Sequence, residues 1–458
     1  MSSWKKVTLE DISESINTGL DAIRRAPIVD FETDIKCLRI QDISQNKPIE
    51  SWGFTEVKNT DYSKFRLMKD DIIMARTCST GICFLAKQDL PAVFNNGLAR
   101  IRLKKDIAYP TYVYYVFKSK SFISYIDGIS GGTSVQLNMK IGDLSKYSFD
   151  LPPLNIQKEI ANKLSDLDKK IQLNTQINQT LEQIAQTIFK SWFIDFDPVH
   201  AKANALASGQ TLEQATQAAM AVISGKNTQE LHRLQTANPK QYQQLWEIAE
   251  AFPSGVDEEG VPWGWEEKPL PELIDFLEGP GIRNWQYTEE EDGIKFINIR
   301  CIKNGDLSLE TANKITREEA FGKYAHFQLK EDDIVISTSG TLGRFALVRN
   351  EHLPLCLNTS VIRFRPIENK STLAFLLGLA SNQLQYELEA RASGSVQRNF
   401  GPTHLKQISV LLPDFYLLSL HNKYISTLFE LRKSNLREND LLMKTRDVLL
   451  PKLLSGEV

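Results

Sequence analysis

The sequence predicts an α+β protein built from two similar halves, each a mixed domain followed by one long helix. Three observations support this prediction. Residues 131–192 recur 261 positions later without a gap, residues 154–192 lack glycine and proline, and the same strand and loop patterns occur in both halves. We therefore expect two globular domains and a pair of long antiparallel coiled-coil helices, related by a pseudo-two-fold axis.

The first long helix is predicted at residues 154–197, after Pro152 and Pro153, with Asn155 as its N-cap. From the residue after this cap to Trp192, at ~1.5 Å per residue, the helix is about 55 Å long, so it needs a partner helix. That partner is expected at residues 416–458. The predicted seam of the first helix comprises Ile160, Leu164, Leu167, Ile171, Leu181, Ala185, Ile188 and Trp192, and that of the second Leu420, Tyr424, Leu428, Leu431, Leu442, Leu449 and Leu453.

Two asparagines occupy the remaining seam positions of the first helix and recur in the second. Asn174 and Asn178 correspond to Asn435 and Asn439, at the same offset of 261 (435 − 174). Chance in a leucine-rich helix does not explain this repetition. We expect Asn174 and Asn178 to fix the helix register by hydrogen bonding to Asn435 or Asn439. The alternative is that they face solvent at a kink or contact a partner.

The two globular domains are expected at residues 1–153 and 261–415. Half-buried strands are predicted at 35–43 and 294–302 from their alternating apolar residues. Residues 65–87 and 327–349 each predict a turn at an aspartate pair, a buried strand, a Ser/Thr/Gly loop and another strand. A further strand follows in each half, and Arg100 and Arg363 occupy corresponding positions in these two strands. Helical stretches are expected near 111–125 and 371–389.

Residues 198–260 have no counterpart in the other half. This segment is rich in alanine and glutamine, and its apolar spacing predicts two or three short helices joined by SGQT, SGKN and ANPK. A linker, a docking surface for a partner and a plain helical spacer all remain open for it.

Composition and charge are those of an ordinary globular protein. Of the 458 residues, 42% are hydrophobic and 24% charged, and the net charge is only −3, so a nucleic-acid surface would have to be local or completed by partners. The five cysteines show no metal-binding spacing and are expected to be reduced thiols. Without a signal-peptide pattern or a long apolar run, a cytoplasmic protein is expected.

No catalytic motif is found. The sequence contains no phosphate-binding P-loop, no dinucleotide-binding glycine motif and no H-E-x-x-H zinc motif. Its one Asn-Pro pair, Asn238-Pro239, continues Lys-Gln rather than with the proline and aromatic residue of an amino-methyltransferase. The aspartate pairs 70–71 and 332–333 are interpreted as turn residues. We therefore expect no catalytic residues, no metal and no bound cofactor.

Groups suited to nucleic acid gather in three pairs of loops. Hydroxyls and backbone N–H groups in the Ser/Thr/Gly loops suit phosphate oxygens, and the amides and cations of the loops at 131–138 and 393–399 suit base edges. The early loops RRAP and GIRN add exposed cations. The predicted DNA-binding residues are Arg24, Arg25, Arg76, Thr77, Ser79, Thr80, Ser134, Gln136, Asn138, Lys140, Arg283, Asn284, Ser339, Thr341, Ser395, Gln397, Arg398 and Asn399.

Identity between the two halves separates these residues into two groups. Gln136 with Gln397, and Asn138 with Asn399, are the same in both copies, which favours a role in architecture or phosphate positioning. Two domains that recognise different sequences should differ where they touch bases. Lys140 against Gly401, and Leu137 against Arg398, are therefore better candidates for base contacts.

This pattern resembles the specificity subunit of type I restriction–modification systems over nearly the whole chain. LPPLNIQKEIANKLSDLDKKI is similar to that family's Leu-Pro-Pro-Leu-x-Glu-Gln-x-x-Ile helix entry. Ile156 stands in place of the usual Glu, and Gln157 is kept. The second copy, LLPDFYLLSLHNKYI, has lost both residues. FKSWFIDFDPV after the first helix and VPWGWE before the second domain also resemble family features.

The resemblance implies that residues 1–153 and 261–415 are target recognition domains, each recognising one half of a split double-stranded DNA target. It implies that the subunit has no catalysis of its own. It also implies assembly with two methyltransferase subunits, which use S-adenosylmethionine, and with two restriction subunits, which use ATP and Mg²⁺ to translocate DNA. A helix of about 55 Å spans roughly 16 base pairs, enough for two half-sites and a gap.

Two other functions remain as alternatives. A two-headed scaffold that gathers proteins without binding DNA would also suit the near-neutral charge. A solitary nuclease or methyltransferase would have to act on DNA without any other subunit.

Overall fold

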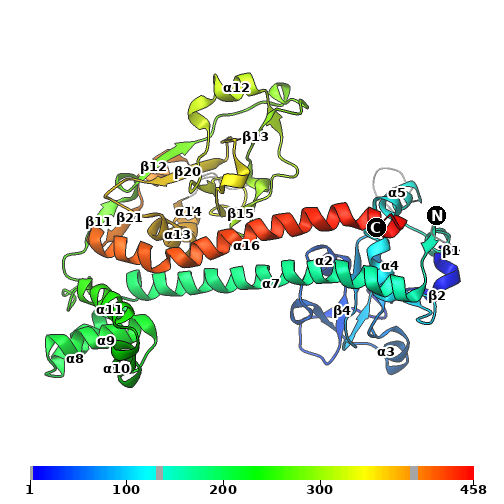
Figure 1. Ribbon diagram of the computed structural model, residues 1–458, viewed down its shortest axis with the longest axis horizontal. Helices are drawn as coiled ribbons and strands as arrows, with labels where there is room; N and C mark the ends of the chain where they lie inside the picture. Colours follow the sequence, from blue (N-terminus) through cyan, green and yellow to red (C-terminus); the bar gives the residue numbers. More distant parts are fainter. Residues whose placement is uncertain (1–3, 130–137, 392–400, 458) are drawn as a thin grey trace. The chain divides into compact units, whose positions relative to one another are not determined.

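The computed structural model describes residues 4–129, 138–391 and 401–457 (Figure 1). The chain divides into two compact units, one formed by Met1–Asn174 with Glu438–Val458 and the other by Thr175–Arg437. Each unit contains one mixed domain and a part of each long helix, α7 (Leu154–Phe193) and α16 (Phe415–Ser455).

In the first unit, the opening strand pairs with the strand that leads into α7. This antiparallel pair closes the domain next to the start of the helix. A four-stranded sheet has the order β2-β9-β6-β7, and a second has the order β3-β5-β4-β8, in which β4 and β8 are parallel. The strands are β1 (Lys5–Thr8), β2 (Ser13–Thr18), β3 (Ile28–Val29), β4 (Lys36–Leu38), β5 (Gly53–Thr55), β6 (Ile72–Ala75), β7 (Cys83–Leu85), β8 (Ala92–Phe94), β9 (Leu98–Leu103) and β10 (Ser148–Leu151).

The domain of the second unit repeats this topology. Its first strand again pairs with the strand that precedes the long helix, its main sheet has the order β12-β20-β17-β18, and β13 and β19 again run parallel. The repeat predicted from sequence is therefore confirmed in the strand connections. The strands are β11 (Glu266–Pro269), β12 (Ile274–Glu278), β13 (Ile294–Phe296), β14 (Ile302–Lys303), β15 (Asp306–Leu307), β16 (Lys314–Ile315), β17 (Ile334–Ser337), β18 (Phe345–Leu347), β19 (Leu355–Cys356), β20 (Val361–Pro366) and β21 (Ser409–Leu412).

Short helices connect the strands of both domains. The first has α1 (Leu9–Ile12), α2 (Ile40–Ser44), η1 (Ile49–Ser51), α3 (Asn59–Phe65), α4 (Pro110–Val116), α5 (Lys120–Ile129) and α6 (Ile141–Leu144). The second has η2 (Leu270–Glu272), η3 (Asn284–Gln286), η4 (Ile299–Cys301), α12 (Arg317–Phe321), η5 (Ala325–Phe327), η6 (Asn350–His352), α13 (Leu373–Asn382), α14 (Leu384–Arg391) and α15 (Pro402–Leu405).

Both strands predicted from alternating apolar residues end early, and the one expected over residues 294–302 stops at Phe296. The strand expected over residues 35–43 stops at Leu38, because the Asp42 carboxylate accepts hydrogen bonds from the backbone N–H and the guanidinium of Arg39 and so starts α2. Each predicted helical stretch, 111–125 and 371–389, is a pair of helices rather than one.

The repeated aspartate pairs form turns, as predicted, and their second members are buried ion-pair partners. Asp70 and Asp332 adopt positive φ angles of 76° and 66°. Asp71 accepts two hydrogen bonds of 2.8 Å from Arg102, and Asp333 is held by Arg365 at 2.7 and 2.8 Å. These paired, forked contacts fix the turn to the neighbouring strand in both domains.

Helix α7 begins at Leu154, before the position predicted for its cap. The Pro153 carbonyl accepts the backbone N–H groups of Ile156 and Gln157, so Asn155 lies within the first turn and the N-cap prediction was wrong. The buried Gln157 side chain accepts the Tyr109 N–H at 2.7 Å and donates to the carbonyls of Ile107 and Pro152. This residue of the helix-entry motif therefore ties the domain to the helix.

Within the first unit, the start of α7 runs antiparallel to the end of α16. Ile160 and Leu164 share a core with Leu450 and Leu453. Further along, Asp168 pairs with Arg446 at 2.9 Å, and Asn174 donates to the Asn439 side-chain oxygen at 3.0 Å. The antiparallel helix pair predicted from sequence is present here.

Within the second unit, the remainder of α7 runs antiparallel to the start of α16. Asn435 donates to the Asn178 side-chain oxygen at 2.9 Å, and Trp192 stacks on Tyr424 with ring centroids 5.5 Å apart. Leu431, predicted as a core position, is 47% exposed, because the buried face of α16 passes through Lys433 and Asn435 at this point.

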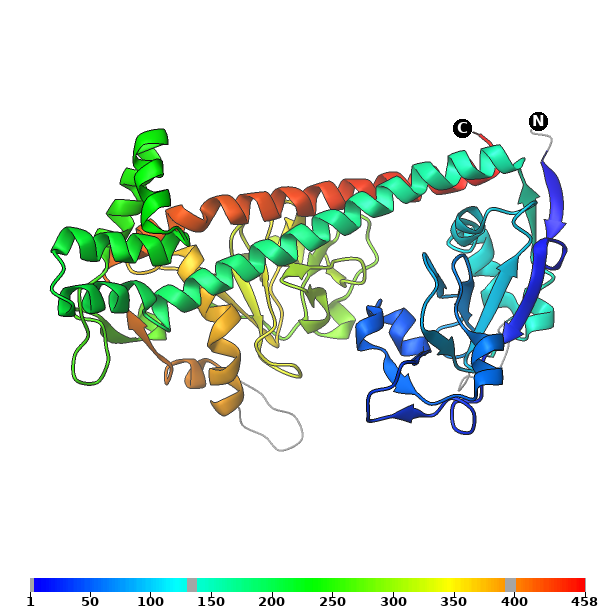
Figure 2. The ribbon, with the colours of Figure 1, turned by 90° about the horizontal axis from the view of Figure 1, so that it is seen from below.

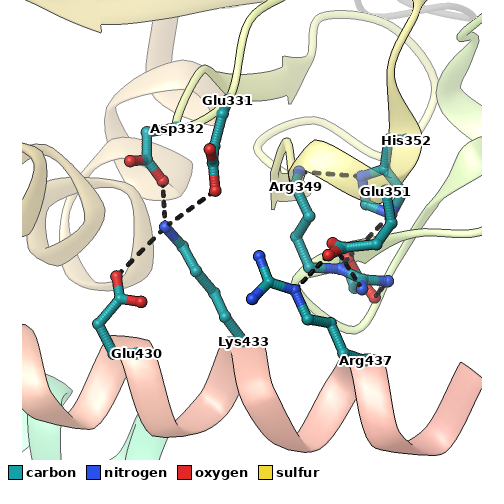
Figure 3. Close-up of polar contacts among 9 residues, drawn as sticks. Glu331, Asp332, Arg349, Glu351, His352, Glu430, Lys433 and Arg437 are labelled. Atoms are coloured by element: carbon teal, nitrogen blue, oxygen red, sulfur yellow. Dashed lines mark hydrogen bonds and ion pairs between the residues drawn. The ribbon is translucent and has the colours of Figure 1, made fainter.

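Polar contacts attach the second domain to α16 (Figure 3). The Lys433 ammonium donates to Asp332 at 2.6 Å and lies 3.4 Å from Glu430 and 3.8 Å from Glu331. Burial alone would lower the pKa of this amine, but the hydrogen bond to Asp332 and the surrounding carboxylates raise it. One turn further, Arg437 pairs with Glu351, next to Arg349.

Residues 198–260 contain more helix than predicted. The three predicted connections separate four helices, α8 (Asp197–Ala207), α9 (Leu212–Ser224), α10 (Thr228–Ala237) and α11 (Pro239–Ala251), which lie beside the end of α7 in Figure 2. The buried Lys202 ammonium donates to the carbonyls of Ala249, Glu250 and Phe252, which end α11. This lysine ties α8 to the end of α11.

The two family-like segments around this insertion contact each other. Phe193 and Phe196, from FKSWFIDFDPV, pack against Trp265, from VPWGWE, with ring centroids 6.0 and 5.3 Å apart. Trp192 also packs edge-on against Phe252 at the end of α11. The aromatic residues at the end of α7 therefore form the core that joins the helix, the insertion and the second domain.

Candidate DNA interface

The Ser/Thr/Gly loop of the first domain lies beside Asn138 and Met139. Thr77 bridges to Asn138, and the Met139 N–H donates to the Arg76 carbonyl at 2.9 Å. The Arg76 guanidinium donates to the carbonyls of Met139 at 3.1 Å and Asn96 at 3.2 Å. Arg76 therefore ties its loop to Met139 and Asn96, and this arrangement brings Thr77 and Asn138 next to each other.

Hydroxyl groups, one amide and one cation near the Arg76 contacts are accessible to solvent. Ser79 and Thr80 are partly exposed, while Asn138 and Lys140 are exposed. Lys140 occupies the N-cap position of α6. The loop returns through Gly81, whose φ of 87° suits glycine.

In the corresponding loop of the second domain, more side chains are buried or hydrogen-bonded within the loop. The Ser337 hydroxyl donates to the Thr341 carbonyl at 2.6 Å and accepts the Arg344 N–H at 2.9 Å. Ser339 is nearly buried, whereas Thr341 and Arg344 are exposed. Thr341 and Arg344 are thus the groups of this loop that solvent, or DNA, can reach.

The early loop of the first domain is held by aspartates. Arg25 forms a forked ion pair with Asp61 and lies over the Phe65 ring, 5.3 Å from its centroid. The hydrogen bond from Arg25 lowers the pKa of the Asp61 carboxyl. Arg24, by contrast, is exposed, and its backbone N–H donates to Asp21. Of the two predicted cations, Arg24 is therefore the freer one for a phosphate.

The equivalent loop of the second domain exposes Arg283 and Asn284, as expected of binding residues. The buried Gln286 side chain holds this loop, because it donates to the Tyr324 hydroxyl at 2.9 Å and to Glu319 at 3.0 Å. Both early loops start at a glycine at the end of a sheet strand. A Cβ on Gly19 would lie 2.3 Å from the Asn95 carbonyl oxygen, and one on Gly279 2.1 Å from that of Asn358.

Two large apolar side chains of these loops are exposed, which the sequence did not predict. Ile23 is 84% exposed and Trp285 79% exposed, each beside a predicted cation. Their apolar character gave no binding signal in the sequence, since an isoleucine or tryptophan in a loop normally packs inward. Only their positions in the folded loops reveal them.

The predicted residues Ser134, Gln136, Ser395, Gln397, Arg398 and Asn399 lie outside the described residues. In the part of the chain that the structure describes, no group of three or more His, Cys, Asp or Glu side chains could hold a metal ion. None of the helices in that part is long and apolar enough to cross a membrane.

Comparison with known proteins gives a consistent family. The family model for the type I restriction modification DNA specificity domain matches residues 1–183 and again residues 262–431. The HindI specificity subunit of Haemophilus influenzae is 32% identical over 479 aligned residues, covering 100% of both chains. The MjaIX specificity subunit of Methanocaldococcus jannaschii is 24% identical, over 85% of this chain and 78% of that protein.

A solved structure shows the same fold. The S subunit of the type I restriction–modification system of M. genitalium covers 99% of this chain and 96% of its own, with 17% identity and a TM-score of 0.51. The resemblance stated from the helix-entry motif and the repeat is thereby confirmed, and nothing in the comparisons favours a protein scaffold. The chain belongs to the specificity subunits of type I restriction–modification systems, the DNA-recognition subunits that have no catalytic activity of their own.

Proposed function

We propose that each of the two domains recognises one half of a split double-stranded DNA target, and that the paired helices set the unread gap between the halves. The observation that carries this proposal is the duplication itself. Two domains of the same strand topology are each followed by a long helix, and the two helices pair through asparagines that the repeat exchanges. Two similar recognition domains held at a defined spacing suit a DNA target that consists of two separated half-sites.

The exposed loop groups of each domain would make the DNA contacts. Thr77, Asn138 and Lys140 in the first domain, and Arg283 and Asn284 in the second, present hydroxyl, amide and cationic groups for phosphates and base edges. The other predicted DNA-binding residues belong to the same proposal. The chain's net charge of −3 suits a subunit whose partners complete the enclosure of DNA.

The proposal includes the partners. Two methyltransferase subunits would dock on the helices and methylate adenine using S-adenosylmethionine, and two restriction subunits would join to translocate and cut DNA using ATP and Mg²⁺. No cofactor is assigned to this chain itself.

Domain exchange tests the proposal. Replacing residues 265–413 with the second domain of another specificity subunit should change one half of the methylated target and leave the other half and the gap unchanged. The measurement is a genome-wide map of methylated adenines in cells carrying the chimaera or the original chain, beside cells lacking the gene. A change in both halves, or in neither, would contradict independent recognition.

A further inference from the structure

The most exposed large apolar side chains in the described part of the chain lie in equivalent places. Ile23 and Trp285 are 84% and 79% exposed, more than any other large hydrophobic residue described. Ile23 follows Gly19 by four residues, and Trp285 follows Gly279 by six. The two glycines both end a sheet strand and both pack on an asparagine carbonyl, that of Asn95 or Asn358. Each domain therefore presents one apolar side chain from its early loop.

Hydrogen bonds hold the loop around Ile23 in one conformation. The Asp21 carboxylate accepts the N–H groups of Ile23 at 3.0 Å and Arg24 at 2.7 Å, and the Asp21 carbonyl accepts those of Arg25 and Ala26. The ion pair of Arg25 with Asp61 then ties the loop to α3. Ile23 is thus exposed on an ordered turn.

A different set of contacts gives Trp285 the same property. Gln286, which follows it, is buried and bonded to Tyr324 and Glu319, and it exchanges hydrogen bonds with the Arg283 backbone at 2.9 and 3.1 Å. The neighbouring Ile282 is buried, and its N–H donates to the Asn358 side chain. Trp285 is therefore directed outward by anchors on both sides.

An aromatic or branched apolar side chain that stays exposed on an ordered loop does not contribute the stabilising free energy that its burial would provide. Two such residues at matching places in a duplicated protein point to a shared ligand, and the flanking cations Arg24 and Arg283 indicate an anionic one. Nucleic acid combines phosphates, which attract the arginines, with apolar base faces and thymine methyl groups.

We propose that Ile23 and Trp285 are DNA-contact residues, which make the apolar part of base recognition in the first and second half of the target. This inference rests on the proposed function, because it assumes that each domain binds one half-site. Contact occurs either with a thymine methyl in the groove or with the face of an unstacked base.

The test uses the full chain assembled with its modification subunits. Trp285→Ala should lower methylation of the target by roughly five- to a hundredfold, as expected for losing a base contact, and relax discrimination only in the half assigned to the second domain. Ile23→Ala should act on the other half. Trp285→Phe should retain most activity, and affinity for unrelated DNA should not change in any variant.

Matched controls are Trp263→Ala and Ile107→Ala, which also remove exposed apolar side chains, 58% and 42% exposed, outside the early loops. If Trp285→Ala and Ile23→Ala behave like these controls, the inference is wrong. Replacing target thymines by uracil separates the two contacts: reduced methylation by the original complex indicates methyl recognition, and unchanged methylation indicates contact with a base face. If the original complex shows no sequence-dependent methylation at all, the proposed function fails instead.

Discussion

At the scale of single residues, His421 is the most unusual buried group of the second unit. It lies among Phe193, Trp192 and Phe189, with its ring 4.8 Å from that of Phe193. Neither ring nitrogen has a hydrogen-bond partner among the described residues, and burial lowers the pKa of the imidazole from 6.5 to about 3. The equivalent position of the first copy is Ile160 (421 − 261), so this place in the repeat tolerates an apolar side chain.

A pH dependence of stability follows from His421. Between pH 6.5 and about 3 the unfolded chain binds a proton that the folded chain does not, so the free energy of unfolding should fall as the pH is lowered through this range. One proton corresponds to about 1.4 kcal/mol per pH unit. His421→Leu should reduce this slope by about one proton in chemical denaturation between pH 4 and 6.5. His232→Leu, which removes an exposed histidine, is the control for the substitution itself.

At the scale of elements, the helix pair is specified by two asparagine pairs. Asn174 with Asn439 lies in the first unit, and Asn178 with Asn435 in the second. Under the offset of 261, Asn174 corresponds to Asn435 and Asn178 corresponds to Asn439. The repeat therefore maps each asparagine pair onto the other pair. Buried amides that hydrogen-bond to each other favour one register at a cost in stability.

Matched and mismatched substitutions test this pairing. Asn174→Leu alone should lower the free energy of unfolding by about 1–3 kcal/mol, because the hydrogen bonds that Asn174 donates to Asn439 and Glu438 are lost. Adding Asn439→Leu should recover that loss or exceed the original stability. The mismatched double variant Asn174→Leu with Asn435→Leu removes the donor of both pairs, so the two losses should add. Equal stabilities of the two double variants in urea denaturation would refute the pairing.

The domains attach to their helices by different residues. Lys433, which binds Asp332, corresponds to Gln172 in the first copy (433 − 261), and Gln157, which binds the loop at Ile107 and Tyr109, corresponds to Leu418 in the second (418 − 157). The duplicated fold has thus kept its strand order while the contacts at the helix have diverged. Docking of partner subunits on the two helices is expected to differ accordingly.

At the scale of the whole molecule, the proposed spacing function depends on continuous helices. Helices α7 and α16 run for 40 and 41 residues without an interior break before Pro451. Any change in the length of this pair would move one recognition domain along the DNA relative to the other under the proposed function.

Lengthening the helix pair should therefore widen the gap. Adding one turn to α7 between Asn174 and Asn178, with a matching turn in α16 between Asn435 and Asn439, adds about 5.4 Å, or one to two base pairs. Both half-sites should stay the same in a map of methylated adenines. As a control, a turn of the same length added to α10, in the insertion, should leave the gap unchanged.

Local patterns explain which features were predictable. The aspartate turns and the strand at Arg100 depend on residues close in sequence, and the structure bears them out, as it does most positions of the helix seams. The strand expected over 35–43 was cut short by the capping contact of Asp42, which alternation of apolar residues does not reveal. Leu431 was misassigned because one turn of α16 presents Lys433 to the domain instead.

The sequence by itself determined the duplicated plan, the pairing of two long helices and the family, because these follow from periodicity and from motifs whose residues are neighbours along the chain. Only the tertiary structure decided that Arg76 closes two loops, that Gln157 and Lys433 anchor the domains, and that Ile23 and Trp285 point outward. These depend on contacts between distant residues and on exposure, which exist only once the chain has folded.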